Sequence, residues 1–189
     1  MKLISIIMLS LVLSGCDLFS TRPAESPNLP RSNFQQAVTP QILVENLINS
    51  FKDENVEDYL SCLSDSSFTK KRFIFVPSSS SLAQFPSGWN IKSEELYFNN
   101  VIAKVTDNSS ITLTLSDENY SPQGDSVIYT ASYSLNVPSS DPNLPQIYEG
   151  SLRFYITTDS RSLYSIDYWQ DYSQNNQLPT WSELKWRNY

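Results

Sequence analysis

Histidine is absent from this 189-residue sequence, and glycine and cysteine are scarce, with four and two copies. Without histidine the chain lacks the usual general base of enzymes, the Ser-His-Asp and Cys-His arrangements, and the commonest metal ligand. The few glycines argue against a glycine-rich loop that would hold phosphate groups. Two distant cysteines form no CxxC pair, and a zinc site needs more ligands. We therefore expect no metal, no cofactor and no catalytic residue.

The charge and the aromatic content narrow the class of protein further. The net charge is −7 with acidic residues spread along the chain, so a nucleic-acid backbone would be repelled. Apolar residues make up 40% of the chain and aromatic residues 13%, which is enough for a packed core. The many tyrosines and phenylalanines favour β-structure. The length suits one domain with extensions.

The chain also lacks an apolar run long enough to cross a membrane. Its apolar run at residues 3–13 has eleven positions, interrupted by Ser5 and Ser10, whereas a spanning helix needs about 20 apolar residues. Lys2 before the run and small residues after it are typical of an export signal. The alternative is a buried helix of the folded domain, and the polar, proline-rich sequence that follows argues against it.

The end of this run resembles the lipobox of bacterial lipoproteins, in the four residues Leu13, Ser14, Gly15 and Cys16. The resemblance implies that the Cys16 thiol receives a diacylglyceryl group and that residues 1–15 are removed as a signal peptide. Acyl chains then hold the protein on a membrane of the bacterial cell envelope, since each buried methylene contributes about 0.8 kcal/mol.

Asp17 follows the expected lipid anchor directly. In enteric bacteria an aspartate at this place resembles the signal that keeps a lipoprotein in the inner membrane. The alternative is an ordinary polar residue, so the choice between inner and outer membrane stays open. Residues 16–38 contain Pro23, Pro27 and Pro30 without helical or strand periodicity and are expected to form a flexible linker. Such a coil would hold the domain about 25 Å from the bilayer.

Residues 39–189 are expected to fold as the domain, beginning with two helices. Thr39 is placed to cap the first helix and Pro40 suits its first position, and Asn55 is the cap of the second. Cys62, in the second helix, is expected to be a packed thiol. Apolar residues recur at helical spacing in both. They are Val44, Leu47, Ile48 and Phe51 in the first helix and Val56, Tyr59, Leu60 and Leu63 in the second.

A strand is predicted at residues 68–77, ended by Pro77, and a third helix at 89–100 with Leu96 facing inward beside Tyr97 or Phe98. The period then changes to two, and turn-rich segments separate the runs. Consecutive strands of this kind predict an antiparallel meander with one buried face. The four predicted strands cover residues 110–117, 126–137, 146–159 and 162–172.

A short helix is predicted to close the chain. Thr180 is its expected N-cap, and Glu183 stands at the capping-box position. Trp181 and Leu184 are expected to face inward, together with either Lys185 or Trp186.

Helices followed by a long curved antiparallel sheet predict an α+β fold. The order resembles the NTF2-like, or cystatin-like, cone fold. Several pieces look more narrowly like a group of uncharacterised bacterial lipoproteins with that fold. They are the opening helices at 39–68, the RFIFVP strand, the WNIKSEELYFNN helix, the IDYWQD strand and the terminal PTWSELKW. That group brings no established activity, so it implies no catalytic residues. NTF2-like proteins as a whole include enzymes, ligand binders and interaction modules.

Four residues are candidates for lining the concave face of the cone, namely Tyr129, Tyr133, Asp167 and Trp169. Tyrosine rings with hydroxyl groups are typical of small-molecule pockets, but they also simply fill cores. We expect a non-enzymatic module that contacts an envelope protein or serves an envelope assembly. The alternative is a small-molecule site in the cone. An enzyme would need at least two titratable groups converging in that cavity.

The anchor is tested by Cys16→Ser, which removes the thiol that would carry the lipid. We expect loss of acylation and an unprocessed or soluble protein, because the variant lacks the thiol to which the acyl chains would be attached. The measurement is fractionation of cells with mass analysis of the N-terminus. Normal membrane retention of the variant would refute the anchor.

Overall fold

The computed structural model describes residues 33–174 and 178–189. The expected signal peptide (1–15), the lipobox with Cys16, Asp17 and most of the linker lie outside the described residues. The end of the linker, from residue 33 onward, is among the described residues. Asn33 bonds Asp53 through its side chain, Gln35 bonds Asn46, and the backbone N–H of Tyr164 donates to Ala37. Residues 33–37 therefore run along the first helix of the domain.

The two helices that open the domain are those expected. Thr39 Oγ1 accepts a hydrogen bond from the backbone N–H of Ile42, and Asn55 Oδ1 accepts one from that of Asp58. The predicted apolar stripes are buried or half-buried, so the predicted faces are confirmed. The helices within residues 33–174 and 178–189 are α2 (Pro40–Lys52), α3 (Val56–Ser61), α4 (Ile91–Ile102) and α5 (Trp181–Arg187).

Five strands form one sheet in the order β1-β5-β4-β3-β2. β2 to β5 pair as an antiparallel meander, as predicted, whereas β1 lies parallel to β5 at the edge. The sheet is therefore mixed. The strands are β1 (Ile74–Val76), β2 (Thr112–Gln123), β3 (Ser126–Asn136), β4 (Ile147–Thr158) and β5 (Tyr164–Tyr172).

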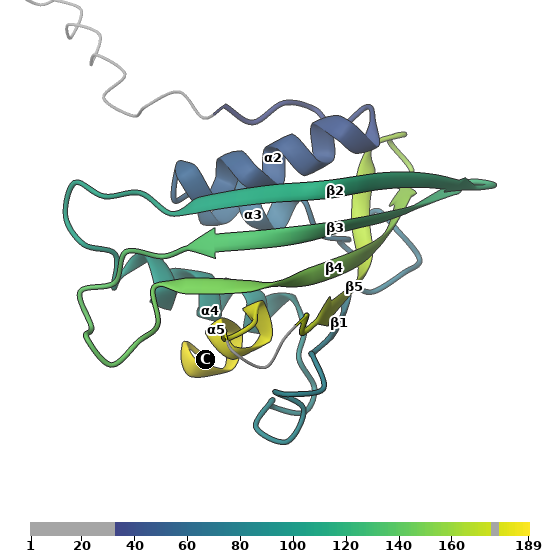
Figure 1. The fold of residues 1–189 in the computed structure, drawn as a ribbon. Helices are drawn as coiled ribbons and strands as arrows, with labels where there is room; N and C mark the ends of the chain where they lie inside the picture. Colours follow the sequence, from purple (N-terminus) through teal and green to yellow (C-terminus); the bar gives the residue numbers. More distant parts are fainter. Residues whose placement is uncertain (1–32, 175–177) are drawn as a thin grey trace, which may run out of the picture. The chain divides into compact units, whose positions relative to one another are not determined.

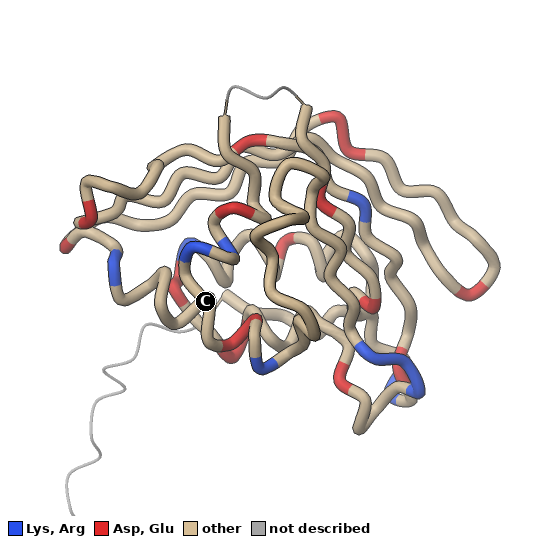
Figure 2. Tube along the Cα trace, turned by 90° about the horizontal axis from the view of Figure 1, so that it is seen from below, with Lys and Arg blue, Asp and Glu red and all other residues tan. Residues whose placement is uncertain are grey.

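The sheet curves around the helices, which lie on its concave side (Figures 1 and 2). Side chains on β3 alternate between this face and solvent, so that Tyr129, Ala131, Tyr133 and Leu135 are buried and their neighbours are not. The α+β prediction is confirmed. Within the described part of the chain, no helix combines the length and the hydropathy needed to cross a membrane.

Several local predictions differ from the structure. β2 runs to Gln123, whereas the predicted strand ends at residue 117. The strand expected at residues 68–77 pairs only over Ile74–Val76, because the polar and cationic residues before it leave the sheet as a loop. Leu96 is 47% exposed, and Tyr97 and Phe98 both face the core instead. Thr180 is the N-cap of α5, as predicted, but it makes no side-chain capping bond, because its hydroxyl lies 2.9 Å from that of Ser78.

Cys62 is a packed thiol, as predicted. It is fully buried, and its Sγ donates to the carbonyl of Asp58 at 3.3 Å. Burial raises the pKa of the Cys62 thiol, and the Asp58 carboxylate raises it further. The group stays protonated and unreactive at neutral pH.

Gly150 provides a test of the packing on the concave face. A Cβ atom at this position would lie 2.5 Å from the carbonyl oxygen of Tyr172 and 2.6 Å from the hydroxyl of Tyr133. We expect Gly150→Ala to lower the free energy of unfolding by about 1–3 kcal/mol, because neither neighbour is free to move. Urea unfolding followed by circular dichroism measures this. Ser151→Ala, on the other face of β4, is the control, and an equal effect there would contradict the packing argument.

Candidate functional site

Aromatic side chains fill the concave face of the sheet. Trp181, from α5, is fully buried and meets the ring of Trp169 edge-on at 4.5 Å between centroids. It also contacts Phe51 at 5.2 Å and Tyr133 at 5.3 Å. The inward orientation predicted for Trp181 and Leu184 is confirmed. The terminal helix thus closes the space between the sheet and the other helices.

Tyr129 and Tyr133, two of the predicted cavity residues, are in this packed interior. The Tyr129 hydroxyl donates to Glu118 Oε2 at 2.8 Å, and the Tyr133 hydroxyl donates to Asp171 Oδ1 at 2.7 Å. Burial raises the pKa of both phenols, and the neighbouring carboxylates raise it further. Both are hydrogen-bond donors that stay protonated, rather than bases.

The other two predicted cavity residues, Trp169 and Asp167, have different surroundings. Trp169 is fully buried and packs on Phe154 as well as on Trp181. Asp167 falls at the irregularity between β4 and β5, and its Oδ2 lies 2.9 Å from the ammonium of Lys71, a largely exposed side chain. The structure therefore gathers the two tyrosines and Trp169 around one aromatic core and directs Asp167 to an ion pair.

A buried ion pair that the sequence did not predict lies at the centre of this core. Lys185 and Glu94 are both 0% exposed, and the Lys185 ammonium lies 2.5 Å from each carboxylate oxygen. The Tyr59 hydroxyl and the Trp89 indole N–H each donate to Glu94 at 2.6 Å. The carboxylate is thereby supplied with four donor contacts, which a buried charge requires.

Aromatic rings surround the same ammonium. The Lys185 Nζ lies 4.1 Å from the ring centroids of Phe75 and Trp169 and 5.1 Å from that of Tyr97. Burial lowers the pKa of Lys185, and the Glu94 carboxylate opposes this by raising it. The resulting pKa is about 8. The cage and the carboxylate together compensate for the lost hydration of the cation.

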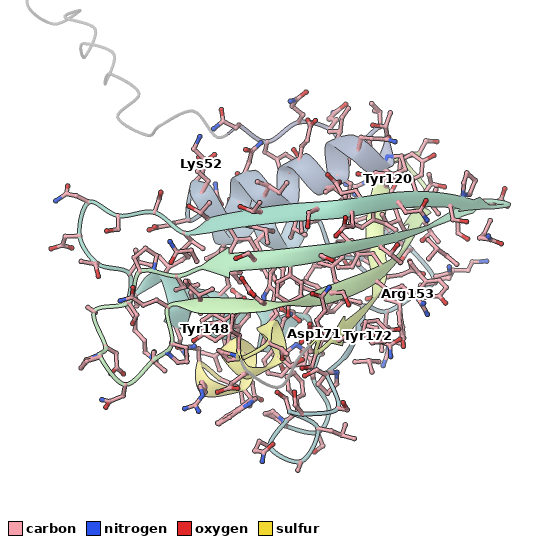
Figure 3. All side chains as sticks on the ribbon, in the orientation of Figure 1. Lys52, Tyr120, Tyr148, Arg153, Asp171 and Tyr172 are labelled. Atoms are coloured by element: carbon pink, nitrogen blue, oxygen red, sulfur yellow. The ribbon has the colours of Figure 1, made fainter. Side chains whose placement is uncertain are left out.

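A second buried polar cluster ties α5 to β5. Asp171 Oδ2 accepts hydrogen bonds from the backbone N–H of Ser182 at 2.8 Å and from its hydroxyl at 2.5 Å. Figure 3 labels Asp171 beside α5. Burial raises the pKa of Asp171, although the bonds from Ser182 and Tyr133 oppose this. These bonds fix the terminal helix over the aromatic core.

An open groove of about 1030 Å³ lies outside this core. Its walls come from residues 34–37, α3 and the loop after it, the start of α4, and the turn between β4 and β5. None of the four predicted cavity residues lines it. Its apolar lining consists of Phe34, Ala37, Leu60, Leu63, Phe68, Phe73, Ile74, Trp89, Ile91, Leu163 and Tyr164.

Charged side chains stand among the apolar residues of the groove. They are Arg72, Lys92, Arg161, Asp65 and Asp159. Arg161 Nε donates to Asp159 Oδ2 at 2.8 Å, and its guanidinium lies 3.8 Å from the ring centroid of Phe68. Arg72 belongs to the run of three cations at 70–72, drawn as a continuous blue stretch in Figure 2. Periodicity did not reveal the groove, because its walls come from separate segments of the chain.

Solved structures share this fold. An NTF2-like superfamily protein from Salmonella enterica has a TM-score of 0.53 and 12% identity, over 71% of this chain and 88% of that chain. A conserved protein from Planctomyces limnophilus has a TM-score of 0.56 and 6% identity, over 70% and 91%. A proposed dehydratase of the NTF2-like family from Streptomyces avermitilis has a TM-score of 0.52 and 9% identity, over 71% and 93%.

At such identities the likeness establishes the fold alone, and it confirms the predicted NTF2-like cone. No family model matches this chain, and no curated protein matches it by sequence.

The ion pair predicts an asymmetric response to mutation. Lys185→Met should lower the free energy of unfolding by about 3–5 kcal/mol, because it leaves the buried Glu94 carboxylate uncompensated. Adding Glu94→Gln should recover part of that loss. Urea unfolding of the full chain at pH 7 measures both effects.

The pH dependence is the control. The pKa of Lys185 in the folded protein, about 8, is below its unfolded value of about 10.4. The unfolded chain therefore binds more protons between these pKa values, and Lys185 makes stability rise with pH across that window. Lys185→Met should lack this contribution. A double variant less stable than Lys185→Met would show that the charge pairing is not what matters.

Proposed function

We propose that this protein is a lipid-anchored protein of the bacterial cell envelope and that its domain works by binding, without catalysis, at the open groove. The anchor is supported by the lipobox resemblance at residues 13–16 and by the export-signal pattern before it. The linker that follows would hold the domain near the membrane.

The observation that supports the binding site is the contrast between the concave face, where a cavity was expected, and the groove. The concave face is occupied by Trp169, Trp181 and their aromatic neighbours, all buried. The groove, by contrast, is open, and its volume of about 1030 Å³ matches the upper range of ligand pockets, about 300–1,000 Å³. A ligand has room in the groove without unpacking the core.

Binding is favoured over catalysis because of the state of the titratable groups. Glu94, Lys185 and Asp171 converge in the interior, but each is at most 1% exposed. Each also forms hydrogen bonds with other residues inside the core. A general acid or base has to reach a substrate proton directly or through one water molecule. These groups serve to hold α5 in place instead.

The position of the groove fits a tethered module. Phe34, Gln36 and Ala37, at the end of the expected linker, form part of its wall. The site therefore adjoins the point where the tether joins the domain. A molecule bound there would be held close to the envelope membrane, which suits an accessory role beside other envelope components.

A photocrosslinking amino acid tests this site in the full chain in its native membrane. Placed at Ser61, an exposed residue of the groove wall, it should give a specific adduct whose mass identifies the class of bound molecule. Ser116, exposed on β2 and outside the groove lining, is the matched control position. Adducts at Ser61 no more frequent than at Ser116 would refute the groove as the binding site.

A further inference from the structure

From the lining of the groove we infer its ligand class, an inference that rests on the proposed function. The ligand is a single-chain anionic amphiphile, such as a long-chain carboxylate. Its alkyl chain lies along the apolar floor, and its acidic head group is paired with Arg72 and Lys92.

The floor of the groove is apolar enough to bind an alkyl chain. Ala37, Leu63 and Phe73 line its base with exposures of 3–6%. Half-buried side chains such as Phe34 and Ile91 add to the apolar lining. An alkyl chain removes such apolar surface from water without needing hydrogen-bond partners.

The rim supplies the sign of the charge. Burial raises the pKa of Asp159, but hydrogen bonds from Arg161 and Leu163 outweigh it and lower that pKa. Asp159 is therefore ionised and neutralises Arg161. Among the described residues, neither Arg72 nor Lys92 lies within ion-pair distance of a carboxylate. They outnumber the remaining lining carboxylate, Asp65.

This local excess of cations is opposite to the net charge of −7 of the whole chain. An anion is repelled by most of the protein and attracted at this rim, which gives both specificity and orientation. A cationic or neutral chain would gain the apolar contacts and leave Arg72 and Lys92 without a counter-ion.

The test uses the full acylated chain, purified in an uncharged maltoside detergent, with a dodecanoate that carries a photoactivatable diazirine. We expect labelling on the peptides that line the groove, residues 60–74, 88–92 and 159–165. Unlabelled dodecanoate should compete for this labelling, whereas dodecyltrimethylammonium, with the same chain and the opposite charge, should not.

Charge-removing variants separate the head group from the chain. Arg72→Gln with Lys92→Gln should weaken labelling on the order of tenfold, the loss expected for one charge-assisted pair. Lys52→Gln with Arg153→Gln removes the same net charge at positions outside the groove and should leave labelling unchanged. Both control residues are labelled in Figure 3.

The outcomes separate this inference from the proposed function. Equal competition by the cationic chain, or full labelling of the Arg72→Gln, Lys92→Gln variant, would overturn the anionic ligand and leave the groove as a binding site. The same holds if the groove peptides stay unlabelled while the crosslinker at Ser61 captures a protein. Absence of both labelling and crosslinking would overturn the inference and the proposed function together.

Discussion

The ion pair between Lys185 and Glu94 is the interaction on which the rest of the domain depends. Taking both charges out of water is costly, and only complete pairing with good geometry offsets that cost. The pairing requires α5 to lie against α4, because each helix supplies one partner. Tyr59 and Trp89 complete it from α3 and from the residues before α4. One buried contact thus fixes the terminal helix against elements distant in sequence.

The closed interior follows from that constraint. With α5 held by the ion pair and by Asp171, Trp181 occupies the space between the sheet and the helices. The concave face of the sheet is therefore a packed aromatic core. Its titratable groups then stabilise the structure, and the groove proposed for binding lies outside it, beside α3 and the β4–β5 turn.

Most of the fold could be predicted from sequence, because its signals are local. The caps Thr39 and Asn55 and the two-residue period of β2 to β5 depend on residues near in sequence. The short β1 and the exposed Leu96 were mispredicted, because an edge strand and a helix face depend on which neighbours cover them. The groove needs several separated segments to meet. The ion pair was not predicted, because Glu94 carried no sequence signal and the choice between Lys185 and Trp186 as the inward residue stayed open.

The sequence by itself determined the α+β class, the helix starts, the antiparallel meander and the lipobox resemblance at Cys16. Each is written in residues a few positions apart, where backbone propensity and side-chain period act directly. Only the tertiary structure decided that Lys185, rather than Trp186, turns inward. It also decided that the cone is filled and that cations gather at an external groove. These features depend on contacts between segments that are distant in sequence. The free energies of such contacts cannot be inferred from the local sequence pattern.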